Sequence, residues 1–196
     1  MKIKILLLLS IFGLLSGGQV YAIGLGFTSG SADEEWTNST GTSGAQTREV
    51  TNSGFILDTA TASNRVFNYR LSLLSEENKN SATGSFSGFT MTHDFGFALI
   101  KNRIFRLWFG PRLNFAFLDN DNANANNSGR LGILYGPVVG VNIHLPRVVT
   151  FSITAGELRG TYEGECVGFD CSSNDEESDT TFMNLSVIFR LGRDNY

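Results

Sequence analysis

Eight charged residues in the middle and C-terminal parts of this sequence could form a buried network of arginines and carboxylates. Such side chains, placed in a confined interior, must be paired or hydrated. A paired set can fill the interior as a structural ion-pair network, or it can line a narrow gated path for water. The candidates are Asp58, Arg70, Asp94, Arg106, Arg112, Glu157, Arg159 and Arg190.

His93 is the residue whose chemistry comes nearest to catalysis. A histidine acts as a general base when a nucleophile and an orienting carboxylate lie beside it. The neighbours expected for it on the same face are Tyr69, Leu71, Pro111 and Leu113. None supplies a serine-like nucleophile or a carboxylate, so we expect no enzyme activity and no catalytic residue. A lipid-modifying barrel enzyme remains an alternative.

The N-terminus has the pattern of a cleaved secretory signal peptide. Lys2 and Lys4 precede an apolar run over residues 5–15, and small and polar residues lead to Ala22. A run of about eleven residues is too short to span a bilayer, which needs ~20. We therefore expect residues 1–22 to be removed and residues 23–196 to form a single exported domain.

Cys166 and Cys171 lie close together in a polar segment. Export takes them to an oxidising compartment, where a local disulfide is the expected state. Neither of the two histidines is near them in sequence, and the spacing of a four-ligand metal site is absent. We expect no metal and no cofactor.

The charge balance argues against a nucleic-acid partner. The chain has 15 basic and 19 acidic residues, and loss of Lys2 and Lys4 leaves 13 basic residues and a net charge near −6. Binding of phosphate backbones requires a basic surface.

The elements that must position these residues are strands. Apolar and small-or-polar residues alternate over 23–31, 49–60, 65–75, 85–100, 104–118, 130–145, 148–164 and 180–192. The connections alternate in length, with short turns at 61–64, 101–103 and 146–147 and long polar loops at 32–48, 76–84, 119–129 and 165–179. An even number of strands with this asymmetry is typical of an all-β, eight-stranded antiparallel up-and-down transmembrane β-barrel.

The two faces of each strand decide between a membrane barrel and a soluble one. Residues 105–117 place phenylalanines, leucines and a proline on one face, and Arg106, Arg112, glycine and asparagine on the other. A lipocalin-like binding barrel, the soluble alternative, would crowd those rings inside and expose rows of glycine to water. We therefore place the apolar face in lipid and the charged residues in the lumen. Glu157 and Arg159 join the lumen only if a bulge near Ala155–Gly156 reverses the alternation.

The sequence resembles the small outer-membrane barrels, including the OmpA-like transmembrane domain and the OmpX-like families. The resemblance rests on the signal peptide, the eight alternating strands, the segment Trp108-Phe-Gly-Pro-Arg-Leu-Asn114 and the C-terminal Tyr196. It implies a monomer in the outer membrane of a Gram-negative bacterium, with outer-membrane lipid and the barrel-assembly machinery as partners.

The long loops are the predicted functional surface. They are acidic or rich in asparagine, as in 33–35, 119–127 and 175–179, and Trp36 could anchor a partner in the first loop. We expect a structural or adhesin-like role, in which these loops contact an extracellular protein or another surface ligand. The alternative is a narrow gated pore through the charged lumen.

Overall fold

The computed structural model describes residues 23–38, 46–59, 66–80, 84–120, 129–145, 148–167, 170–171 and 175–191. The predicted signal peptide lies outside these residues, so its cleavage stays a prediction. The strands are β1 (Ile23–Asn38), β2 (Gln46–Asp58), β3 (Phe67–Asn80), β4 (Gly84–Lys101), β5 (Phe105–Asn120), β6 (Gly129–His144), β7 (Val149–Val167), β8 (Asp170–Cys171) and β9 (Asp175–Leu191). β8 only forms a small hairpin with the end of β7.

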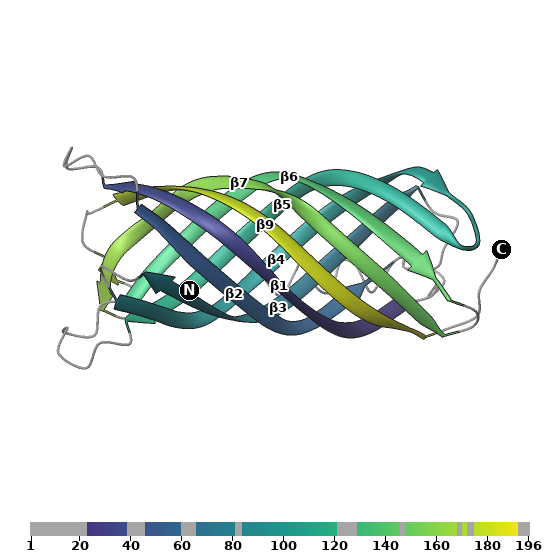
Figure 1. Ribbon diagram of the computed structural model, residues 1–196, viewed down its shortest axis with the longest axis horizontal. Helices are drawn as coiled ribbons and strands as arrows, with labels where there is room; N and C mark the ends of the chain where they lie inside the picture. Colours follow the sequence, from purple (N-terminus) through teal and green to yellow (C-terminus); the bar gives the residue numbers. More distant parts are fainter. Residues whose placement is uncertain are drawn as a thin grey trace.

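The eight long strands close into an antiparallel barrel (Figure 1). Each pairs with its neighbours along the chain, and β9 pairs with both β7 and β1. The closing seam joins the first and the last of the described strands, since Ile23 lies opposite Leu191. The predicted eight-stranded up-and-down barrel is thus confirmed.

The register of the pairs gives the barrel a shear of ten residues. A path across the strands from Phe27 returns to β1 at Thr37, ten residues further along. It runs through Phe55, Leu73, Met91, Phe115, Ile133, Thr161 and Glu177. Strands staggered in this way tilt by roughly 40° from the barrel axis, so each residue climbs it by about 2.5 Å.

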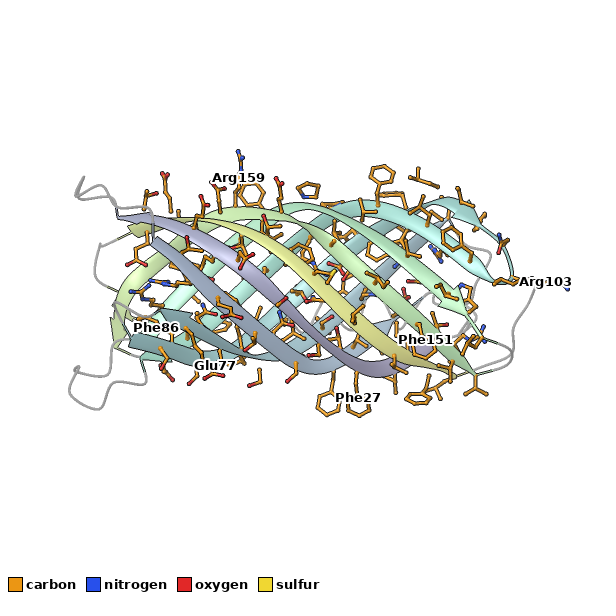
Figure 2. All side chains as sticks on the ribbon, viewed as in Figure 1. Phe27, Glu77, Phe86, Arg103, Phe151 and Arg159 are labelled. Atoms are coloured by element: carbon orange, nitrogen blue, oxygen red, sulfur yellow. The ribbon has the colours of Figure 1, made fainter. Side chains whose placement is uncertain are left out.

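The inner and outer faces alternate as predicted from the period of two. In β6, Leu134, Val138 and Asn142 are buried in the lumen, whereas Val139 and Ile143 are exposed on the outer wall. Phe27 points away from the barrel in Figure 2. A belt of exposed phenylalanine, leucine, isoleucine and valine surrounds the barrel. Water would penalise such a belt and lipid does not, which excludes the soluble lipocalin-like alternative.

Glycines on the inner face make room for large lumen side chains. Trp108 is fully buried, and a Cβ added to Gly140 would lie 2.1 Å from its ring atom Cε2. Glycine is therefore required opposite this ring, because any other residue would push the indole out of its place.

The strands extend into segments that we predicted to be loops. β1 continues to Asn38, β3 to Asn80 and β9 starts at Asp175. Alternation persists in these extensions, with Glu34, Glu76 and Glu176 buried in the lumen and their polar neighbours exposed outside. The polar residues in these segments therefore show where the barrel wall extends beyond the hydrocarbon layer, and they do not show where the strands end. Among the described residues, no helix has the length and apolarity to cross a bilayer.

The prolines inside β5 and β6 do not produce bulges between these two strands. Pro111 and Pro137 face each other, and the register between the two strands is unchanged through them. On the other side of each proline, the pairing of β5 with β4 and of β6 with β7 is interrupted, but the register is the same before and after the interruption. A missing N–H thus removes a ladder bond but does not add a residue to the strand.

Candidate functional site

A buried polar network closes the periplasmic half of the lumen. Arg70 Nη2 lies 2.8 Å from Asp58 Oδ2 and Arg70 Nε 3.0 Å from the same oxygen, and both residues are essentially inaccessible. Arg70 also donates to Ser152 Oγ at 3.0 Å and to Asn142 Oδ1 at 3.3 Å, and its guanidinium lies 5.0 Å from the Trp108 ring. This network crosses the lumen, because it joins strands that are not neighbours.

A second buried pair lies further along the barrel. Arg112 donates from Nε to Asp94 Oδ1 at 2.6 Å and from Nη2 to Asp94 Oδ2 at 2.9 Å, a bidentate arrangement. The guanidinium of Arg112 lies 4.1 Å from the centre of the Phe182 ring. Four of the predicted lumen residues are therefore brought together, as the pairs Asp58–Arg70 and Asp94–Arg112.

Arg106 and Arg190 occupy the lumen near its periplasmic end. Arg106 donates to Asn68 Oδ1 at 3.1 Å, and Arg190 donates to the backbone oxygen of Leu145. Both are buried, as the face assignment predicted.

Glu157 and Arg159 do not reach the lumen, which corrects the predicted bulge. The buried residue between them is Leu158, and Arg159 is 76% exposed on the outer wall. Figure 2 shows Arg159 pointing away from the barrel. The register of β7 is regular there, so the change from apolar to charged residues after Ala155 reflects height above the membrane and not a change of face.

A further charged cluster, at the extracellular end of the lumen, was missed from the sequence. Arg48 Nη1 lies 3.7 Å from Glu34 Oε2, and Arg48 Nη2 lies 3.6 Å from Glu176 Oε2. Arg130 forms an ion pair with Glu176 and lies over the Phe86 ring. These residues fell in or next to segments assigned to loops, and the alternation continuing through them was the signal that could have placed them.

Between the extracellular cluster and the periplasmic network the lumen has little free space. A cavity of about 30 Å³, lined in part by Leu74, Leu134, Leu158 and Phe182, lies there. That volume accommodates one or two water molecules. The lumen is therefore packed with side chains in this conformation, as expected for eight strands.

His93 lies on the outer wall and is bonded to a tyrosine. Tyr69 Oη is 2.6 Å from His93 Nδ1, and the Phe115 ring packs edge-on against the imidazole. Within the described residues, the other ring nitrogen of His93, Nε2, has no hydrogen-bond partner. The second histidine, His144, lies inside and bonds through Nδ1 to Thr150 Oγ1 at 2.9 Å.

Three of the predicted site residues lie in extracellular strand segments where side chains are not described. Trp36 belongs to β1 and not to a loop, since its backbone pairs with Gln46 and Ser178. Cys166 and Cys171 face each other across the β7–β8 hairpin. Their disulfide stays a prediction, because their side chains lie outside the described residues. In that described part, no group of three or more histidine, cysteine or acidic side chains could hold a metal ion.

The outer wall of the extracellular half forms an acidic collar. Among the described residues its exposed carboxylates are Asp33, Glu35, Glu49, Glu77, Asp119, Glu157, Glu163, Glu177 and Asp179. Lys79 and Arg159 are the exposed bases there, and each pairs with a collar carboxylate, Glu77 and Asp179 respectively. Asp33 lies directly opposite Glu49, and Glu35 opposite Asp179.

The fold is similar to those of solved bacterial surface and outer-membrane proteins. Neisserial surface protein A superposes with a TM-score of 0.54 at 12% identity, over 83% of this chain and 96% of that one. The outer membrane protein AlkL, solved in lipid bilayers, superposes with a TM-score of 0.51 at 11% identity, over 92% and 95% of the two chains. The chain has the fold of the small outer-membrane β-barrels. No protein-family model matches its sequence, and no curated protein sequence is significantly similar to it.

Proposed function

We propose that this protein is an integral outer-membrane barrel of a Gram-negative bacterium that captures positively charged partners at the cell surface through its acidic collar. The partner class is a basic extracellular protein or peptide. The fold accounts for the membrane location, and the collar provides a surface that a cationic partner would recognise.

The observation that carries the proposal is the pairing of like charges across strands. Carboxylates directly opposite each other on a sheet are destabilising. The collar contains two such pairs in exposed positions, Asp33–Glu49 and Glu35–Asp179. Each pair has a single base beside it, Lys79 opposite Glu49 and Arg159 bonded to Asp179, so one carboxylate of each pair is left over. A cation bound between the strands would relieve this repulsion, so the arrangement suits a surface that is completed by a positively charged partner.

The packed lumen favours this role over a pore. Ion pairs lie on both sides of a cavity with space for only one or two waters. The interior is thus suited to stiffening the barrel, and the collar remains the accessible charged surface.

The test measures binding of a fluorescent oligolysine peptide to vesicles that contain the full chain. Neutralising Asp33, Glu35, Glu49 and Glu77 to Asn or Gln should weaken binding about 30-fold at low salt, since an exposed charge contact contributes about 0.5 kcal/mol. Wild-type binding should also fall steeply as salt is added.

A matched control replaces Ser53 and Ser75, which lie on the same outer face, with Asn. It should leave binding unchanged. If the four-fold neutral variant binds the peptide as well as wild type does, the collar is not a capture surface and the proposal fails.

A further inference from the structure

Glu76 is a lumen carboxylate that forms no ion pair with any described residue. It points inward from β3 and is 7% exposed. Its Oε2 accepts a hydrogen bond from Thr90 Oγ1, on the neighbouring strand, at 2.5 Å. A hydroxyl group orients the carboxylate but brings no charge. An ionised carboxylate that is removed from water is costly unless a positive charge lies beside it.

The charges in the extracellular half of the lumen do not balance. Within the described residues, the carboxylates buried there are Glu34, Glu76 and Glu176. The two arginines beside them pair elsewhere, Arg48 with Glu34 and Glu176, and Arg130 with Glu176. Three carboxylates against two arginines leave one negative charge, and it lies at Glu76.

The cavity of about 30 Å³ in the lumen has Glu76 in its wall. Polar side chains line it from four neighbouring strands: Asn52 on β2, Glu76 on β3, Thr90 and Thr92 on β4, and Asn114 on β5. Asn52 lies directly opposite Glu76, and Thr92 lies directly opposite Asn114. Their oxygen atoms therefore form a continuous patch on one side of the cavity.

Three oxygens of this patch have no hydrogen-bond partner among the described residues. They are Asn52 Oδ1, Thr92 Oγ1 and Asn114 Oδ1, and all three atoms are essentially inaccessible. Thr92 is 4% exposed and Asn114 is 8% exposed. Water in the cavity can donate hydrogen bonds to these oxygens, but it brings no charge and leaves the Glu76 carboxylate uncompensated.

One base also lines the cavity, and its charge is already balanced. Arg112 donates from Nε to Asp94 Oδ1 at 2.6 Å and from Nη2 to Asp94 Oδ2 at 2.9 Å. The uncompensated charge at the cavity is therefore negative, so the cavity favours a cation. Carboxylate, amide and hydroxyl oxygens are the ligands that hard metal cations prefer.

We propose that this cavity binds a single alkali-metal ion, held by the Glu76 carboxylate and by the side-chain oxygens of Asn52, Thr92 and Asn114. A monovalent ion matches the single excess negative charge, whereas a divalent ion would reverse it. A cavity with space for one or two waters holds one such ion and at most one water. The site lies inside the barrel, so it goes beyond the proposed capture of cationic partners on the outer wall and does not depend on it.

Reversible urea unfolding of the full chain in lipid vesicles tests the site. Sodium or potassium chloride is exchanged for N-methylglucamine chloride, whose cation is too large for the cavity. Constant ionic strength keeps the screening of all other charges equal. Because the ion binds only the folded chain, a tenfold higher concentration of it should raise the ratio of folded to unfolded chain by up to about tenfold. Equal stability in all three salts would overturn the site.

Glu76→Gln removes the charge but keeps the size of the side chain and an oxygen for the hydrogen bond from Thr90. Whatever the stability of this variant, its dependence on the alkali ion should disappear. Thr92→Val removes one oxygen and keeps the shape, so it should weaken ion binding about tenfold.

Glu77→Gln is the matched control for the ion dependence. Glu77 is the next residue along β3, but its side chain is 48% exposed on the outer wall. This variant should keep the full dependence on the alkali ion. Persistence of the dependence in Glu76→Gln, or its loss in Glu77→Gln as well, would overturn the site.

The same variants separate this inference from the proposed function. Glu76→Gln keeps every collar carboxylate, so it should bind oligolysine as well as wild type does. The four-fold neutral variant of the collar keeps Glu76, so its stability should still depend on the alkali ion.

Discussion

Removing the charge of Asp58 tests whether the lumen around Arg70 is as tightly packed as the structure indicates. Asp58→Asn preserves the shape of the side chain but leaves Arg70, 1% exposed, without its anion. Breaking a buried ion pair on one side costs about 3–5 kcal/mol. The contacts of Arg70 to Ser152 and Asn142, and its approach to the Trp108 ring, persist. We therefore expect Asp58→Asn to lower the free energy of unfolding by about 3 kcal/mol, which is near the lower end of that range.

Trp108 is a built-in reporter for this measurement, because it is fully buried and lies 5.0 Å from the Arg70 guanidinium. The chain has two tryptophans, so Trp36→Phe makes the signal specific. The assay is reversible urea unfolding in lipid vesicles, followed by tryptophan fluorescence. Adding Arg70→Met to Asp58→Asn should recover most of the lost stability, since no buried charge is then left alone.

A loss below about 1 kcal/mol for Asp58→Asn would refute the reasoning. That value is typical of solvent-exposed pairs, so it would mean that water reaches Arg70 and that the lumen opens in the membrane. The lumen would then have to be considered again as a pore.

Three further outcomes follow from the wall and its ends. Val139 lies on the outer face near the middle of the membrane, so Val139→Arg should destabilise the folded barrel by about 2–4 kcal/mol. Thr51 lies on the same face near the extracellular edge of the membrane, so Thr51→Arg should cost less than about 1 kcal/mol. Equal costs of the two variants in urea unfolding would contradict the assigned membrane level. Gly140→Ala should displace Trp108, which destabilises the barrel by about 1–3 kcal/mol and shifts the tryptophan emission to the red. An unchanged emission spectrum would argue against the close contact between Gly140 and the Trp108 ring. Cys166 and Cys171 should resist alkylation until a reductant is added, and labelling of both thiols in unreduced outer membranes would exclude the disulfide.

Alternation was sufficient to predict most of the barrel, because one face of each strand meets lipid and the other meets a crowded lumen. It placed Asp58, Arg70, Asp94 and Arg112 inside, where the structure has them. Which arginine meets which carboxylate depends on the stagger between strands. The sequence carries no signal for that stagger, so the pairs became visible only in the structure.

The errors share one cause, which is that polarity has two sources in a barrel that extends beyond its membrane. A polar residue can face the lumen, or it can face water above the lipid. Glu157 was assigned to the lumen, although it faces water on the outer wall. Glu34 was assigned to a loop, although it faces the lumen from a strand. A pattern of single residues cannot separate these cases without the height of each residue along the barrel axis.

The seam between β1 and β9 has a consequence for biogenesis. The strands that complete the wall are the first and the last of those that the structure describes, and they pair from Ile23–Leu191 to Asn38–Glu176. Until the C-terminal strand is present, the unfinished sheet has two unpaired edges, which can template pairing with other chains. Contacts between such distant segments also form slowly. We therefore expect that a chain cut short before β9 aggregates instead of forming a smaller barrel, and that cells must hold the nascent sheet open until its two ends meet.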